Sequence, residues 1–380
     1  VYTLNALIAA LLLLGAAHGS SPWLWLLFGL GLGNHLSLLL LAPALWLLAR
    51  RAPCRSSVRE SGPRNAVACL LAVAVGLAVY LCLPLWAAAD PAVNWGDPRT
   101  LDRFLWMLTA APYRGYVFAL PLADLPARLS AWAGMLVHQF GWPGAALAML
   151  GLWDMLGDGD RRWAWATGSI FVLYSVYALG YDTADSYTYL IPAYLAATLW
   201  LARGAHVLLR DSRSWAARMA MAERAWAARL PLAVAILLLA LPLRHALTNW
   251  SALDVSRDDA ARVYVQAAYA ALPPRALVMS ASDQHTFALW YGRLVHDRAD
   301  VLIVDRDLTQ FAWYRQQAAR LDDNVVWAGD DATPAEHMAE LTRALYGHRP
   351  LFLAEDDAAP LNDWRWQRRE PLLEVIGPGR

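Results

Sequence analysis

The chain contains a series of apolar runs, each about long enough to cross the hydrocarbon core of a bilayer. A helix needs about 20 consecutive apolar residues for that crossing. Only 17% of the residues are charged, against about 25% in a soluble domain. We therefore predict a polytopic α-helical membrane region over residues 1–249, with about 7–8 spans. The main apolar runs are 1–17, 66–89, 129–152, 163–181, 186–209 and 230–248.

The apolar run from Trp23 to Ala49 is too long for one ordinary span. Glycines and polar residues interrupt it, at Gly29, Gly31, Gly33, Asn34 and His35. This pattern predicts two short helices, about 23–33 and 36–49, that turn at Asn34-His35. A single long tilted helix is the alternative.

Arginine placement predicts the orientation of the spans, because short cytoplasmic loops are rich in basic residues. The 50–64 connection holds five arginines and the 203–229 connection holds six. Both are expected on the cytoplasmic side. Alternation then places the 90–127 loop, the 181–186 turn and residues 250–380 outside the cytoplasm. The basic residues are all Arg, as in a GC-rich bacterial genome, so the predicted location is a bacterial inner (plasma) membrane.

The N-terminal end is unusual for a complete membrane protein. Val1 enters an apolar run directly, with no initiator Met, charged flank or signal peptide. We expect the chain to be part of a longer protein, with a membrane region that is incomplete at its N-terminus.

Residues 250–380 show the pattern of a soluble α/β domain. Short apolar strands are expected at 276–279, 301–304 and 351–353, and helical patterns alternate with them at 286–294, 311–321 and 334–346. Alternation of this kind predicts a small, mostly parallel sheet. Its ligands would bind beyond the carboxyl ends of the strands. We favour a structural or recognition role for this domain over catalysis. The polar residues at the strand ends are Ser280, Ser282, Asp283, Asp305 and Asp307.

Polar residues at membrane depth are expensive, so we take Asn34 and His35 as candidate substrate-binding residues. They follow a glycine-rich half-helix and precede another apolar run. His35 could hold a phosphate or transfer a proton. The alternative is a helix turn in which Asn34 caps the preceding helix.

The loop at 90–127 combines aromatic and charged residues that suit a sugar phosphate. Aromatic faces stack on sugar rings, and Arg binds phosphate oxygens with two parallel hydrogen bonds. The alternative is an Asp-Pro turn that leads into an interfacial helix at 99–111. The candidate binding residues are Trp95, Asp97, Arg103, Tyr113 and Arg114.

The turn at 181–187 carries two carboxylates and two phenols close to apolar runs. Asp182 and Asp185 could bind a hydroxylated substrate or tune a proton. The alternative is a polar turn in which Asp185 caps the next helix.

The sequence indicates neither a cofactor nor a metal. Cys54, Cys69 and Cys82 have no zinc-type spacing. The formal net charge is +0, so no basic field indicates a nucleic-acid partner.

Taken in order, several segments resemble one bacterial membrane family. That family is related to the protein O-mannosyltransferases, and its animal relatives act in the endoplasmic reticulum. The resemblance covers nearly the whole chain and depends on the order and spacing of its motifs. The motifs are Val1-Tyr2-Thr3-Leu4-Asn5, residues 29–37, residues 94–98, Tyr113-Arg114, Tyr181-Asp182 with Asp185 and Pro192, Leu272-Pro273-Pro274, and residues 282–291.

The resemblance implies a GT-C glycosyltransferase fold and activity. Such enzymes move a sugar, here expected to be mannose, from a polyprenyl phosphate to an extracytoplasmic protein or glycan acceptor. In the family the catalytic carboxylate lies in the first outer loop, upstream of the position that matches Val1. No catalytic residue is therefore identified here, and these 380 residues alone are expected to be inactive. The alternatives are a transporter or flippase of lipid-linked saccharide, and a non-catalytic scaffold with a periplasmic binding domain.

Overall fold

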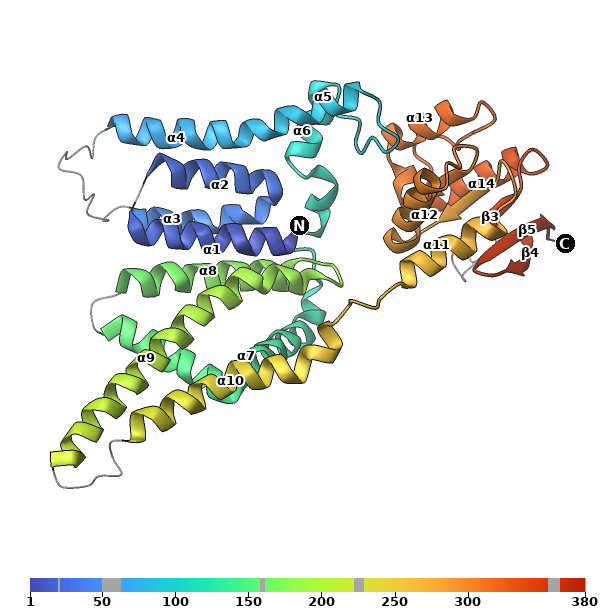
Figure 1. The fold of residues 1–380 in the computed structure, drawn as a ribbon. Coiled ribbons are helices and arrows are strands. Elements are labelled where there is room, and N and C mark those ends of the chain that lie inside the picture. Colours follow the sequence, from blue (N-terminus) through green and yellow to red (C-terminus); the bar gives the residue numbers. More distant parts are fainter. Residues whose placement is uncertain (20, 50–62, 158–160, 222–228, 355–362, 380) are drawn as a thin grey trace. The chain divides into compact units, whose positions relative to one another are not determined.

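A computed structural model describes residues 1–380 except 20, 50–62, 158–160, 222–228, 355–362 and 380. The chain is mostly helical, with a small mixed sheet near its C-terminus (Figure 1). It divides into two compact units. The first comprises Val1–Pro91 and Pro98–Trp250, and the second comprises Ala92–Asp97 and Ser251–Arg380. The predicted boundary, between residues 249 and 250, lies one residue before the observed boundary between Trp250 and Ser251. The segment 92–97 belongs to the second unit, although the sequence predicted it as part of the 90–127 loop.

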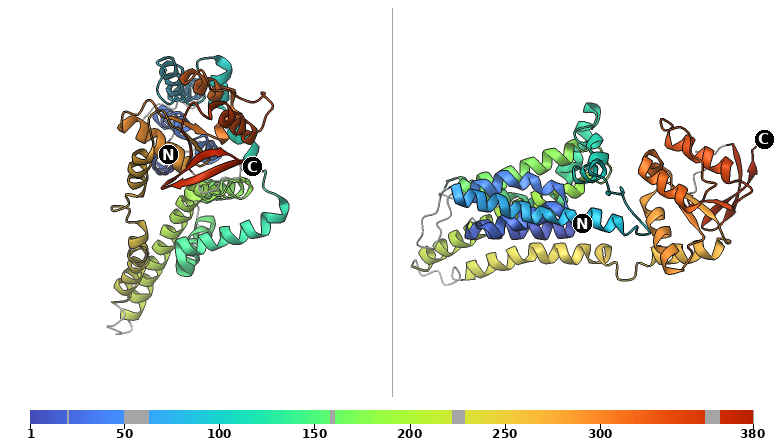
Figure 2. Two further views of the ribbon diagram at one scale, coloured as in Figure 1. Left: turned by 90° about the vertical axis from the view of Figure 1, so that its right-hand side faces the viewer. Right: turned by 90° about the horizontal axis from the view of Figure 1, so that it is seen from above.

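The first unit consists of helices. Several of them, including α1, α2 and α8, run alongside one another (Figures 1 and 2). The α-helices are α1 (Tyr2–His18), α2 (Pro22–Asn34), α3 (Ala42–Ala49), α4 (Pro63–Leu77), α5 (Cys82–Ala88), α6 (Leu101–Leu108), α7 (Leu125–Gly157), α8 (Arg161–Gly180), α9 (Ile191–Met221) and α10 (Leu230–Leu253). Short 3-10 helices join them: η1 (Leu36–Leu41), η2 (Ala78–Leu81), η3 (Ala111–Tyr116), η4 (Leu122–Asp124) and η5 (Ser186–Leu190).

The predicted break in the 23–49 run is confirmed, at the predicted place. The α2 helix ends at Asn34, and His35 is extended with φ −159°. The His35 Nδ1 then accepts a hydrogen bond of 3.1 Å from the Ser37 amide, which starts η1. The alternative of one long helix is therefore wrong.

The glycines before this turn pack helices together and do not interrupt α2. A Cβ on Gly29 would lie 3.0 Å from the Val73 Cα, and one on Gly76 would lie 2.6 Å from the Leu26 carbonyl oxygen. The α2 and α4 backbones therefore meet at a distance that only small residues permit. Such contacts are typical of helices that associate in lipid. The prediction that the glycines interrupt the run was wrong, since the chain turns only after them.

A second close crossing joins α7 and α9. A Cβ on Gly151 would lie 2.6 Å from the Gly204 amide nitrogen, and closer still to the Trp200 carbonyl oxygen. One turn along, the nearly buried Asp154 accepts a hydrogen bond of 2.5 Å from the Arg203 guanidinium. Small residues, together with the ion pairs of Asp154 with Arg203 and Arg210, thus join these two helices.

Two of the described helical segments are long and apolar enough to cross a membrane, Ala66–Ala88 and Leu230–Leu253. Their apolar side chains face outward: α10 has no buried residue, and Leu70 on α4 is 69% exposed. Apolar surface on this scale needs lipid or a partner to cover it. Of the other predicted spans, 129–152 is interrupted by a kink at the non-helical Gly141 (φ 65°), whereas the rest fold as helices. Whether any of them crosses a membrane stays a prediction.

The second unit is built on a five-stranded sheet of order β2-β1-β3-β5-β4. The first three strands are parallel, as predicted, but β5 pairs antiparallel with both β3 and β4. The sheet is therefore mixed, and the prediction of a mostly parallel sheet missed its last two strands. The strands are β1 (Leu277–Ser280), β2 (Leu302–Asp305), β3 (Leu351–Leu353), β4 (Trp364–Arg369) and β5 (Leu372–Pro378).

Helices cover both faces of this sheet. Val278, Ile303 and Phe352 share one core with α11 and α12, whose Leu289 is fully buried. On the other face, Thr342 of α14 donates a hydrogen bond to the Met279 sulfur. Alternate residues along each strand point to opposite faces, so the apolar strands are covered on both sides. The helices are α11 (Ala260–Ala271), α12 (Asp283–Val295), α13 (Ala312–Leu321) and α14 (Pro334–Leu345), with η7 (Asp307–Gln310) between β2 and α13.

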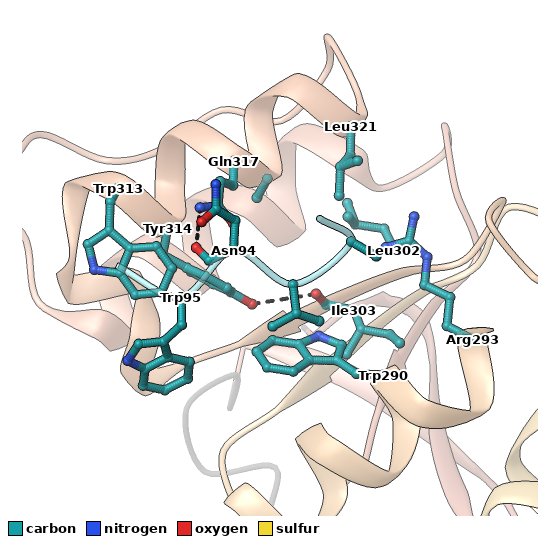
Figure 3. Close-up of a pocket in the computed structure, with 13 residues that line it drawn as sticks. Asn94, Trp95, Trp290, Arg293, Leu302, Ile303, Trp313, Tyr314, Gln317 and Leu321 are labelled. Atoms are coloured by element: carbon teal, nitrogen blue, oxygen red, sulfur yellow. Dashed lines mark hydrogen bonds between the residues drawn. The ribbon is translucent and has the colours of Figure 1, made fainter. Parts of the chain in front are cut away.

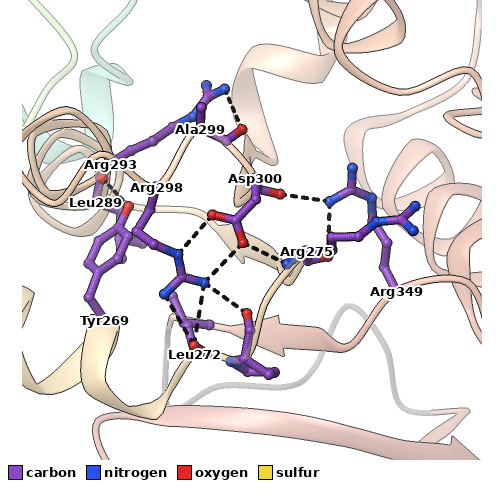
Figure 4. Close-up of polar contacts among 10 residues, drawn as sticks. Tyr269, Leu272, Arg275, Leu289, Arg293, Arg298, Ala299, Asp300 and Arg349 are labelled. Atoms are coloured by element: carbon purple, nitrogen blue, oxygen red, sulfur yellow. Dashed lines mark hydrogen bonds and ion pairs between the residues drawn. The ribbon is translucent and has the colours of Figure 1, made fainter.

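Ionic contacts tie together the loops that lead into β1, β2 and β3 (Figure 4). The Arg298 guanidinium binds both carboxylate oxygens of Asp300, at 2.8 and 3.1 Å, and that carboxylate also accepts the Arg275 amide at 2.7 Å. Arg349 donates to the Arg275 and Asp300 carbonyls and forms a buried ion pair of 2.5 Å with Asp322. These contacts fix the start of the parallel strands.

Candidate functional site

A cluster of tyrosines surrounds His35 in the first unit. The His35 ring lies 5.6 Å from the ring centroids of both Tyr2 and Tyr189. Tyr189 in turn lies 5.0 Å from Tyr177 and 5.1 Å from Tyr181. These five residues come from α1, the α2–η1 turn, the end of α8 and η5. We call them the tyrosine–histidine cluster.

Local backbone bonds explain why the cluster forms where α8 ends. Tyr181 directly follows α8, and its amide donates to the Tyr177 carbonyl at 3.0 Å, so the two rings lie 5.4 Å apart. Beyond α8, the Asp182 amide donates to the Tyr116 carbonyl at 2.9 Å, and this bond fixes the turn against η3. The Tyr116 ring therefore lies 6.0 Å from that of Tyr181.

A backbone hydrogen bond orients the His35 imidazole. Its Nδ1 accepts the Ser37 amide, so in the neutral ring the proton sits on Nε2. The imidazole can therefore donate a hydrogen bond to a ligand from that nitrogen.

An open pocket of about 460 Å³ lies beside the same turn, between the start of α7 and the end of α8. Its polar residues include Asp124, Arg128 and Asp182, and Trp132 and Tyr187 supply aromatic surface. We call it the Arg128 pocket. Its volume is within the range of small-molecule sites, roughly 300–1,000 Å³.

Arg128 is fixed in this pocket by the 182–186 turn. Its Nη1 donates to the Thr183 carbonyl at 3.1 Å and to the Ser186 Oγ at 2.5 Å. Trp132, one turn further along α7, donates from Nε1 to the Ser175 Oγ at 3.2 Å. A fixed guanidinium with carboxylates and an indole can bind a ligand that has hydroxyls and one anionic group.

No family model, no curated protein and no solved structure matches this chain. The resemblance to the mannosyltransferase-related family therefore stays a prediction.

Two predicted site residues, Trp95 and Asp97, belong to the second unit, whereas His35 belongs to the first. The Trp95 ring packs 5.7 Å from Trp313 and 6.4 Å from Phe287. Gln317 donates from Nε2 to the Asn94 carbonyl at 2.6 Å (Figure 3). The pocket beside this segment has a volume of about 50 Å³, below the roughly 300–1,000 Å³ of small-molecule sites.

Asp97 is buried in a tight turn. Gly96 and Asp97 both have positive φ, 71° and 44°, and the Asn94 side-chain amide donates to the Asp97 carboxylate at 3.1 Å. The helix α6 follows soon after Pro98. The Asp-Pro turn of the alternative interpretation is thus present, and the helix after it spans Leu101–Leu108, within the predicted 99–111. Its interfacial position stays a prediction.

The remaining predicted residues lie in the first unit. Asn34 donates from Nδ2 to the Val1 carbonyl at 3.3 Å, and Arg114 is exposed and bonds the Thr109 carbonyl. Asp185 is the N-cap residue of η5, as the alternative interpretation expected, but its side chain forms no capping hydrogen bond. Asp182 lines the Arg128 pocket, Tyr113 is 49% exposed on η3, and Arg103 lies in α6.

Sequence reasoning missed Arg128, Trp132, Tyr177 and Tyr189. Arg128 directly precedes the apolar run at 129–152, and a charge at the edge of a predicted span could have drawn attention to it. The spacing of Tyr177 and Tyr181 was a second available signal. What brings the residues together is tertiary packing, which neither signal reveals.

The polar residues at the strand ends of the second unit bond one another. Thr286 donates at 2.6 Å to Asp305, and its hydroxyl lies 2.7 Å from that of Ser280. Burial raises the pKa of Asp305, and the Leu308 amide binds its other oxygen. Ser282 caps α12. Among the described residues no group of three or more His, Cys, Asp or Glu could hold a metal.

Proposed function

We propose that this chain is part of a GT-C-type membrane glycosyltransferase that moves a sugar, mannose by the family resemblance, from a polyprenyl-phosphate donor to an extracytoplasmic protein or glycan. The Arg128 pocket is the observation that supports this proposal. It combines a fixed guanidinium, two carboxylates and aromatic surface at the ends of apolar helices.

The sugar phosphate of the donor would lie in this pocket and its polyprenyl tail in the lipid. Its phosphate accepts hydrogen bonds from Arg128, which has N–H groups on Nε and Nη2 besides those on Nη1. Asp124 and Asp182 accept bonds from sugar hydroxyls, and Trp132 borders the ring. The polyprenyl tail stays among the apolar side chains that the helices expose. Because the resemblance implies a catalytic carboxylate upstream of Val1, the residues described here bind and orient the donor.

The position of the pocket favours transfer at a membrane surface over transport. Ala127 and Arg128 lie in the first turn of α7, and Ala178 and Leu179 in the last turn of α8. A transporter carries its substrate site near the bilayer midplane. A scaffold without activity would need no such pocket.

Donor binding by the 380-residue chain tests this proposal. Radiolabelled polyprenyl-phosphate mannose is titrated into nanodiscs that hold the wild type, Arg128→Ala or Arg128→Lys. A hydrogen bond to a charged group contributes about 1.5–3 kcal/mol, so Arg128→Ala should weaken binding about 10- to 100-fold. Arg128→Lys keeps the charge but loses the fork geometry, and should fall between the two.

Arg161→Ala is the matched control, because Arg161 is an exposed arginine at the other end of α8. It should bind as the wild type does. Thermal unfolding of each variant checks that the fold is retained. Absence of saturable binding to the wild type, or equal binding by Arg128→Ala, would refute the proposal.

A further inference from the structure

The helix α12 exposes an apolar stripe to its surroundings. Phe287, Tyr291, Leu294 and Val295 are between 48% and 63% exposed. At about 100° per residue, these positions and Trp290 fall on one side of the helix. We call this surface the α12 stripe.

The opposite side of α12 is the one that packs into the domain. Thr286, Leu289 and Gly292 are buried, and a Cβ on Gly292 would lie 2.6 Å from a Val265 methyl of α11. Trp290 at the edge of the stripe packs against the core of the domain, and Phe287 contacts Trp95, whereas Tyr291, Leu294 and Val295 are 57–63% exposed. A continuous stripe of large side chains, unlike scattered exposed residues, marks an interaction surface.

The composition of the stripe fits the headgroup zone of a bilayer. Tyr and Trp concentrate there because one end of each ring is apolar and the other hydrogen-bonds water. Phe and Leu reach the acyl boundary from a helix that lies in the membrane plane. Arg293, which is half-buried at the margin of the stripe and bonds the Ala299 carbonyl, adds a positive charge that suits lipid phosphates.

The chain keeps this domain near any membrane that α10 crosses. The membrane-length helix α10 ends at Leu253 and α11 begins at Ala260. The six residues between them reach at most about 20 Å when fully extended. A soluble domain on so short a tether meets the bilayer surface continually.

We propose that the α12 stripe is a docking surface for the headgroup layer of the bilayer. Phe287, Tyr291 and Leu294 insert into that layer, and Arg293 meets the lipid phosphates. This inference rests on the proposed function, which places the chain in a membrane. The α12 stripe would then be a second membrane contact, besides the apolar helices of the first unit.

Depth-dependent quenching tests this docking in the 380-residue chain. Cys54, Cys69 and Cys82 are replaced by Ser, and Tyr291→Cys is labelled with a bimane fluorophore. The protein enters nanodiscs of phosphatidylcholine and phosphatidylglycerol, with or without a spin label near the lipid headgroup. The control label is placed by Arg343→Cys, on an exposed position of α14 across the sheet.

We expect the spin-labelled lipid to remove at least half of the fluorescence at position 291 and little at position 343. No quenching at 291, or equal quenching at both positions, would overturn the proposal. Self-quenching that rises with the number of chains per disc would assign the stripe to a second copy and would also overturn it. The quenching measurement needs no sugar donor, so the two proposals are tested separately. If the chain does not bind the donor but the label at position 291 is still quenched, only the proposed function is refuted. Unchanged thermal unfolding of each variant shows that the label reports on a folded domain.

Discussion

Replacing Gly151 by alanine should push α7 and α9 apart. The added Cβ would lie 2.6 Å from the Gly204 amide nitrogen and 2.8 Å from the Trp200 carbonyl carbon. Ordinary contacts between such atoms begin at about 3.5 Å. The neighbours are backbone atoms of α9, which no rotamer change can move. The helices must therefore separate by nearly 1 Å or more.

The expected loss of stability follows from that separation. Overpacking of a tight contact costs about 1–3 kcal/mol, and the rigid backbone on the α9 side favours the upper end. The bond between Asp154 and Arg203, one turn away, must also lengthen from 2.5 Å. We expect a free energy of unfolding lower by about 2–3 kcal/mol.

Unfolding in mixed detergent and SDS micelles, followed by tryptophan fluorescence, measures this loss. Gly134→Ala is the matched control, because Gly134 lies in the helical part of α7 before the kink at Gly141 and a Cβ there meets nothing within 4 Å. It should leave stability unchanged or raise it by up to about 1 kcal/mol, the helix-propensity gain of alanine. The double variant Gly151→Ala, Gly204→Ala should lose less than the sum of the two single losses, since one separation relieves both contacts.

Equal stabilities for Gly151→Ala and Gly134→Ala would refute the close crossing. A fully additive double variant would show that the two glycines do not share one contact.

Two further predictions concern the second unit. Arg349→Met leaves the buried Asp322 carboxylate without its ion pair, so urea unfolding of the domain should show a loss of about 3–5 kcal/mol in the free energy of unfolding. Arg368→Met, in the exposed pair with Glu370, should change this free energy by less than about 1 kcal/mol. Similar losses in the two variants would contradict the burial argument. The Arg298 fork, followed by the Arg275 amide, lowers the pKa of Asp300 from 3.8 to about 2, so this carboxylate stabilises the fold above pH 3.8 and its contribution disappears as the pH falls toward 2. Because Asp300 is one-third exposed, solvent screening reduces its contribution to the free energy of unfolding to about 1 kcal/mol. In Asp300→Asn the free energy of unfolding should change less between pH 4 and pH 2 than in the wild type. The same change in both proteins would contradict this prediction.

The parallel strands could be predicted from the sequence because their side chains are almost all apolar. β1, β2 and β3 are buried on both faces, which leaves a short apolar run in each. β4 reads Trp-Arg-Trp-Gln-Arg-Arg and is largely exposed, so its pattern has no apolar run to find. β4 and β5 form an antiparallel edge, in which Leu372 and Val375 of β5 are buried.

The candidate site was predicted in separate pieces. The sequence predicted Asn34-His35 and the 181–187 turn as candidate sites because polar residues interrupt apolar runs there. That His35 and Tyr189 lie 5.6 Å apart follows from the packing of α1, α8 and η5, which no local pattern contains. Trp95 was expected near a sugar, but its partner Trp313 lies more than 200 residues away in sequence, and that packing decides its position.

The central claim is that the Arg128 pocket and the C-terminal domain share the non-cytoplasmic side of a membrane. Single cysteines replace Asp182 in the pocket, Gln284 on α12 and Arg213 on α9, in a chain whose natural cysteines are changed to serine. A maleimide that cannot cross the inner membrane is then added to intact spheroplasts. The account predicts labelling at positions 182 and 284 before lysis, and at position 213 only after it. Labelling of 182 and 284 from opposite sides would contradict it.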